Sequence, residues 1–162
     1  MLKLMRIAVS IFVPFVIGAF SIPVNADQKV YPGSMGVKLS GASPTYYFGA
    51  IGNSSAANIY LDLPVINDTN TAVESSWVRV LDRHYSSGVS CALNTAYWNN
   101  TYDTFYGSWG ATVVSSGSST DVQVLNTGTA NGSADRHIYF SCSIPPVYSG
   151  NSSRIVSYSV DE

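Results

Sequence analysis

Short runs of alternating apolar and polar residues recur along the chain, and turn-forming residues separate them. Alternation with a period of two is typical of a β-strand with one buried face. The apolar spacing of an amphipathic helix does not persist for more than about one turn anywhere in the sequence. This pattern predicts a single-domain, all-β antiparallel β-sandwich, immunoglobulin-like or jelly-roll-like. The expected strands lie near residues 36–40, 45–51, 57–63, 75–82, 88–98, 102–114, 120–126, 136–144 and 153–160.

The two cysteines of the chain fall on the apolar faces of two expected strands. Cys91 shares its face with Val89, and Cys142 shares its face with Phe140. Two inward cysteines far apart in an exported chain predict one disulfide, which we expect to cross between the two packed sheets. Phe140 stands two residues before the second cysteine, where an immunoglobulin domain has a tyrosine. The pattern therefore predicts a β-sandwich, but it does not predict the immunoglobulin order of strands.

The first 26 residues differ in character from the rest of the chain. Lys3 and Arg6 precede a nearly unbroken apolar run over residues 7–20, and a short polar stretch follows. A run of this length is shorter than the roughly 20 residues that span a membrane, and the stretch after it ends in a small residue suited to signal peptidase. We therefore expect residues 1–26 to be a signal peptide. Residues 27–162 would then be one exported domain, extracellular or periplasmic, with no membrane span.

Charge is sparse in the expected mature domain. The chain has eight Lys and Arg against ten Asp and Glu, so removal of Lys3 and Arg6 leaves six cations and a net charge of about −4. Nucleic acid requires clustered cations, and an anionic membrane surface attracts polybasic segments. The composition therefore argues against both as partners.

A distinctive ending closes the chain. Residues 140–146 read Phe-Ser-Cys-Ser-Ile-Pro-Pro, and residues 153–162 read Ser-Arg-Ile-Val-Ser-Tyr-Ser-Val-Asp-Glu. Shorter segments at 46–50, 53–55 and 78–80 accompany it. Together these segments resemble small exported bacterial proteins of uncharacterised function. The resemblance implies export and a β fold, and it implies no activity.

Aromatic residues are dense between positions 97 and 109. Asn99 and Asn100 lie among them and suit a two-residue hairpin turn, because Asn tolerates positive φ. Such a turn would pair Tyr97 with Tyr102 and would set the faces of both strands.

With that turn, the larger aromatic side chains fall on the outer face of the sheet beside amide and carboxylate groups. Aromatic rings stack on the C–H faces of sugars, while amides and carboxylates bond sugar hydroxyls. We therefore predict a glycan-binding surface, with ordinary cross-strand packing of aromatic rings as the alternative. Its expected residues are Trp98, Asn99, Asn100, Asp103, Phe105 and Trp109.

The tripeptide Asp-Arg-His occurs twice, each time shortly before a Ser-Cys pair, and the two copies hold both histidines of the chain. If the disulfide joined two strands that run the same way, both copies would lie at one end of the sandwich. They could then form an ion-pair network, an anion site or a two-histidine metal site, although zinc would need more ligands and no metal is predicted. Charged strand ends are the alternative. The residues concerned are Asp82, Arg83, His84, Asp135, Arg136 and His137.

Catalysis has weak support in the sequence. A Ser-His-Asp triad drawn from so many serines has no specificity, and the Gly-x-Ser-x-Gly nucleophile motif is absent. The leading hypothesis is a non-catalytic exported module that acts through its surface on glycans or cell-envelope components, with no cofactor. The alternatives are a structural or envelope subunit that assembles with copies of itself through strand edges, and a secreted hydrolase.

Overall fold

The computed structural model describes residues 27–162 except Ser118 and Ala134. The expected signal peptide, residues 1–26, lies outside the described residues. Within the described part of the chain the regular structure is β-strand, apart from one short 3₁₀ turn at Gly33–Met35. No helix in that part is long and apolar enough to cross a lipid bilayer.

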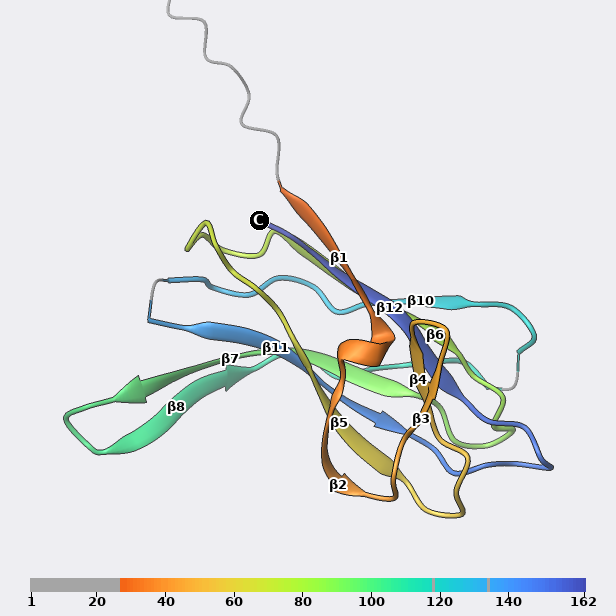
Figure 1. Cartoon of the computed structure of the whole chain (residues 1–162). Helices are drawn as coiled ribbons and strands as arrows, with labels where there is room; N and C mark the ends of the chain where they lie inside the picture. Colours follow the sequence, from red (N-terminus) through yellow and green to blue (C-terminus); the bar gives the residue numbers. More distant parts are fainter. Residues whose placement is uncertain (1–26, 118, 134) are drawn as a thin grey trace, which may run out of the picture.

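The strands form two antiparallel sheets that pack face to face (Figure 1). This architecture confirms the predicted antiparallel β-sandwich. One sheet, here called the β12 sheet, has the order β10-β6-β12-β4-β3, with β1 also paired to β12. Its strands are β1 (Gln28–Pro32), β3 (Thr45–Tyr47), β4 (Ala50–Gly52), β6 (Ser75–Leu81), β10 (Gln123–Asn126) and β12 (Arg154–Asp161).

The other sheet, here called the β11 sheet, has the order β2-β5-β11-β7-β8, with β9 also paired to β7. The hairpin of β7 and β8 extends away from the body of the sandwich (Figure 1). The strands of this sheet are β2 (Val37–Gly41), β5 (Ile59–Pro64), β7 (Ser90–Asn99), β8 (Thr104–Trp109), β9 (Val113–Val114) and β11 (His137–Ile144).

The core lies between the two sheets and is built by alternate residues of each strand. Ile138, Phe140, Cys142 and Ile144 of β11 are buried, while the residues that alternate with them are partly exposed. The ring of Tyr158, from β12, meets Phe140 edge to face at 5.5 Å and donates its hydroxyl to the carbonyl of Pro64 at 2.7 Å. Aromatic pairs in this geometry add stability beyond the area that they bury.

Cys91 and Cys142 form the predicted disulfide, but the bond lies within one sheet. The two cysteines are directly opposite on the neighbouring strands β7 and β11, with their Cα atoms 4.1 Å apart. The expected bridge between the two sheets is therefore wrong. Alternation tells which face a cysteine occupies, but it does not tell which strand lies beside it.

Two expected strands are each divided in the structure. Residues 45–51 form the hairpin of β3 and β4, because Gly49 adopts a φ of 82° and reverses the chain. Residues 102–114 contain β8 and β9, separated at Gly110. A Cβ on Gly110 would lie 2.2 Å from the carbonyl oxygen of Leu93, so the chain approaches β7 too closely there for a side chain.

Candidate functional site

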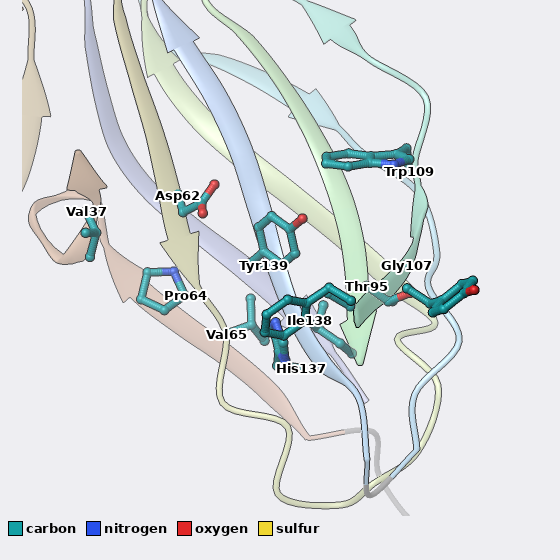
Figure 2. Close-up of a pocket in the computed structure, with 13 residues that line it drawn as sticks. Val37, Asp62, Pro64, Val65, Thr95, Gly107, Trp109, His137, Ile138 and Tyr139 are labelled. Atoms are coloured by element: carbon teal, nitrogen blue, oxygen red, sulfur yellow. The ribbon is translucent and has the colours of Figure 1, made fainter. Parts of the chain in front are cut away.

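A cleft of about 680 Å³ lies on the outer face of the β11 sheet (Figure 2). Because Ile138 and Phe140 point into the core, His137 and Tyr139 on the same strand point outward. The same alternation turns Asp62 outward from β5. Figure 2 shows Asp62, Tyr139 and Trp109 along this face, each on a different strand.

Cross-strand pairing arranges the outward side chains in rows that run across the strands. Tyr139 on β11 is paired with Pro64 on β5 and with Asn94 on β7. Asn94 is paired in turn with Trp109 on β8. Since neighbouring strands lie about 4.8 Å apart, the backbone positions of Tyr139 and Trp109 are separated by roughly 10 Å.

The next row across the strands contains two residues with little or no side chain, Ala96 and Gly107. His137 is paired with Ala96, and Ala96 is paired with Gly107. Gly107 lies between Phe105 and Trp109 on the same face of β8, so the two large rings stand on either side of a position with no side chain. A Cβ on Gly107 would lie 2.3 Å from the carbonyl oxygen of Thr95, and a larger residue could fit only if β8 moved.

The aromatic rings of β7 and β8 are open to solvent. The exposed fraction is 77% for Trp109, 65% for Phe105 and 45% for Trp98. Phe105 meets Trp98 edge to face at 4.9 Å and His137 at 6.3 Å. Contiguous exposed apolar surface on a folded protein marks an interaction site.

Among the described residues that line the cleft, Asp62 is the one carboxylate, and none is Lys or Arg. Its Oδ1 atom is shielded from solvent and has no hydrogen-bond partner among the described residues. Burial raises the pKa of the Asp62 carboxyl. Burial, followed by the charge of Asp62, raises the pKa of the Tyr139 hydroxyl. The cleft therefore combines apolar rings with an acceptor that can bond a ligand hydroxyl.

The hairpin loop differs from the predicted two-residue turn at Asn99 and Asn100. Tyr97 is paired with Tyr106, and the loop comprises the four residues 100–103. The side chain of Asn99 accepts a hydrogen bond from the backbone N–H of Thr101 at 2.9 Å, and positive φ occurs at Asp103 instead, at 51°.

This register shifts every predicted pairing by four positions. Because four is even, each residue keeps its face, and Trp98 lies opposite Phe105. Phe105 and Trp109 line the cleft. Three other predicted residues lie outside the cleft, at or beside the hairpin loop: Asn99, Asn100 and Asp103.

The two Asp-Arg-His triplets lie at opposite ends of the sandwich. The strands that follow them, β7 and β11, are neighbours but run antiparallel. Residues 82–84 therefore precede the start of β7, while His137 is paired with Ala96 near its end. The predicted joint site does not form. In the residues that the structure describes, three or more His, Cys, Asp or Glu side chains nowhere gather to hold a metal ion.

The first triplet has a structural role. Asp82 is fully buried and accepts hydrogen bonds from the hydroxyls of Ser115 at 2.7 Å and Ser153 at 3.1 Å, and from the backbone N–H of His84 at 3.0 Å. Nδ1 of His84 accepts two backbone N–H bonds from residues 86–87. A triad histidine must donate from this nitrogen to a carboxylate, so His84 is not arranged for that chemistry.

His137 and Asp62 share the cleft but stand in different rows. Asp62 is paired with Ser141, which is four residues from His137 along β11. At about 3.3 Å per residue, this offset is roughly 13 Å, too far for a proton to pass directly between the two side chains. The described residues of the cleft therefore do not assemble a Ser-His-Asp site.

Sequence reasoning did not place Asp62 and Tyr139 in the site. Alternation along residues 136–144 already predicts that Tyr139 points outward. The sequence does not show that β5 lies beside β11, and this pairing brings Asp62 to the same outer face as Tyr139. No local pattern in the sequence carries that pairing.

No protein-family model matches the sequence, and no curated protein matches it. One similar solved structure is a family two carbohydrate esterase from Cellvibrio japonicus, with a TM-score of 0.51 and 6% sequence identity over 84% of this chain. This chain spans 34% of the length of that esterase. Another is the low-affinity xylan-binding module CBM86 from Roseburia intestinalis, with a TM-score of 0.41 and 14% identity, covering 84% of this chain and 96% of the module. At these identities the similarity to the esterase defines a fold class, the antiparallel β-sandwich domain.

Proposed function

We propose that this protein is an exported, non-catalytic module that binds a polysaccharide chain in the cleft on the outer face of the β11 sheet. The observation that carries the proposal is the ring of Trp109, which is 77% exposed at the wall of that cleft. A sugar ring stacked on it would cover apolar surface that the fold leaves open to water.

The rows of the sheet suggest how a glycan would lie. A chain along the row that joins Trp109, Asn94 and Tyr139 would meet an aromatic ring at each end of that row. Asn94 is buried and already engaged, since its Nδ2 donates to Ser141 at 2.6 Å. Asp62 supplies the carboxylate of the described lining, so it is the group that would accept a sugar hydroxyl.

The charge of the cleft favours a neutral glycan. Asp62 is its carboxylate, and the part of the lining that the structure describes contains no Lys or Arg to pair with an acidic sugar. A uronate or sulfate group placed beside Asp62 would meet like charge in a partly buried site, which is unfavourable.

Affinity electrophoresis in gels that contain a neutral glucan, xylan or mannan tests the proposal, with polygalacturonate as the acidic comparison. Trp109→Ala removes the exposed ring, and Phe48→Ala removes a still more exposed ring between β3 and β4, outside the cleft. We expect at least one neutral polysaccharide to retard the wild type and Phe48→Ala. Trp109→Ala should weaken binding by about 30-fold, as for a residue at the centre of an interface.

Two results would contradict the proposal. One is equal retardation of the wild type and Trp109→Ala. The other is retardation by polygalacturonate alone, because the carboxylate of Asp62 would oppose an acidic chain.

Export by way of residues 1–26 belongs to the same proposal, as does the resemblance to small exported bacterial proteins. A buried disulfide between Cys91 and Cys142 is compatible with an oxidising compartment. Sequencing the N-terminus of the protein recovered outside the cytoplasm should read from Asp27. A product that retains residues 7–20 would contradict cleavage at this site.

A further inference from the structure

The other side of the sandwich carries most of the arginine of the described residues. Arg79, Arg83 and Arg154 lie on or just beyond β6 and β12, which are paired side by side in the β12 sheet. The ion pairs among the described residues all involve Lys29 instead. No described carboxylate therefore lies within 4.0 Å of these three guanidinium groups.

Arg83 and Arg154 line one small pocket of about 230 Å³. The other polar side chains of its lining belong to Asn151 and Ser152. Both arginine Nε atoms are shielded from solvent and have no hydrogen-bond acceptor among the described residues. Two like charges thus line one pocket, and neither of them is in an ion pair among the described residues.

The position of Arg154 is fixed by an aromatic contact. Its guanidinium carbon lies 3.7 Å from the ring centre of Tyr47, within the range of a cation–π interaction. Gly52 makes this contact possible, because a Cβ there would lie 2.8 Å from Cγ of Arg154 and 2.9 Å from the Tyr47 ring. The hydroxyls of Tyr47 and Ser152 also meet at 3.3 Å.

The position of Arg83 is fixed through its backbone. Its N–H donates to the hydroxyl of Ser153 at 2.9 Å, and that hydroxyl donates to the buried carboxylate of Asp82 at 3.1 Å. Asp82 points into the protein, where its carboxylate accepts three hydrogen bonds, and it is in none of the ion pairs among the described residues.

A tight turn supplies the remaining donors. Ser149 and Gly150 adopt φ values of 49° and 78°, and the backbones of Tyr148 and Asn151 exchange hydrogen bonds of 3.1 and 2.9 Å. Positive φ at both central residues is the signature of a type I′ turn, which is well defined in shape. The turn holds Asn151 and Ser152 at the rim of the pocket.

We infer that this pocket binds a tetrahedral oxyanion, a phosphate or a sulfate group. Guanidinium, hydroxyl and amide groups are the donors that such an anion requires, and charge-assisted bonds from arginine are the strongest of them. The donors come from β12, from the segment after β6 and from the turn, so they approach from several directions. That arrangement suits oxygens that point several ways, whereas a planar carboxylate is served by one arginine fork.

Titration of the ¹⁵N-labelled, disulfide-bonded protein tests the inference. The probes are inorganic phosphate, sulfate, methyl phosphate and acetate, each added at constant ionic strength with sodium chloride. Phosphate and sulfate should shift the amide signals of Asn151 and Ser152 saturably. Methyl phosphate binding as well as inorganic phosphate would indicate a group carried on a larger molecule, and weaker binding would indicate a free ion.

Three variants locate the effect. Arg83→Gln and Arg154→Gln should each weaken phosphate binding by about tenfold or more. Arg79→Gln is the matched control, because Arg79 lies on the same sheet, 4.6 Å from the ring centre of Trp77 and outside the pocket. Arg83→Gln leaves the Tyr47 stack intact, so it remains informative if Arg154→Gln does not fold.

Three outcomes would overturn the inference. These are a non-saturable response to phosphate and sulfate, an equal affinity for acetate, and an equal loss in Arg79→Gln. Each of these outcomes is independent of whether the cleft binds a glycan, because the pocket and the cleft lie on different sheets.

Discussion

The buried carboxylate of Asp82 joins three segments that are far apart in the sequence. It accepts hydrogen bonds from Ser115, which follows β9, from Ser153, which precedes β12, and from the backbone of His84. Asp82→Ala removes the acceptor from all three donors at once. We expect this substitution to be among the most destabilising single changes outside the apolar core.

The magnitude follows from the groups left behind. Ser115 and Ser153 are buried, and each hydroxyl or N–H that loses its acceptor costs about 1–3 kcal/mol. Removal of a buried charge recovers part of that cost, so we expect a net loss of about 3–5 kcal/mol in the free energy of unfolding. Asp82→Asn keeps one oxygen, and the Ser115 hydroxyl can turn toward the carbonyl of Val89, 3.3 Å away. Its cost should be about 1–2 kcal/mol.

Equilibrium unfolding in urea, followed by tryptophan fluorescence under non-reducing conditions, measures both variants. Asp121→Asn is the control, because Asp121 is exposed and a change there should stay within about 0.5 kcal/mol. A cost below about 1 kcal/mol for Asp82→Ala would refute the reasoning, since the three donors would then have found other partners.

Three further predictions concern stability. Replacing Cys91 and Cys142 together by Ala frees a segment of sequence separation 51 and should cost about 4 kcal/mol in urea unfolding; a cost near zero would contradict it. Gly107→Ala should lower the unfolding free energy by about 1–3 kcal/mol, because its Cβ would meet Thr95, and an unchanged melting temperature would contradict that contact. Burial raises the pKa of Asp62 above its usual 3.8, so ionisation there opposes folding. Asp62→Asn should therefore stabilise the protein at pH 7, and the gain should disappear below about pH 3.8; a gain that persists in acid would contradict this origin.

The faces of the strands could be predicted from the sequence, because they depend on a local property. In β11, alternation assigns Phe140 and Cys142 to the core and Tyr139 to the outside, and the structure has them there. The same parity kept Trp98 and Phe105 on one face, although the hairpin loop is two residues longer than expected. A shift by an even number of residues changes partners but preserves faces.

The neighbours of each strand could not be predicted in this way. Backbone hydrogen bonds are available to every strand alike, so alternation in β5 and in β11 contains no sign that the two are adjacent. That adjacency places Asp62 beside Tyr139 and creates the cleft. The direction of β7 relative to β11 was equally open, and its antiparallel course separates the two Asp-Arg-His triplets.

The net charge of the sequence does not reveal where individual charged side chains lie in the fold. A surplus of acidic residues argues against partners that need a broad basic surface, such as nucleic acid. It does not exclude a site for one anion, because at physiological salt a charge is screened beyond about 8 Å and the local groups set the potential. Among the described ion pairs, Lys29 meets Asp27, Asp68 and Glu162. Arg83 and Arg154 have no such partner there, so the pocket that they share is positive within a domain of negative net charge.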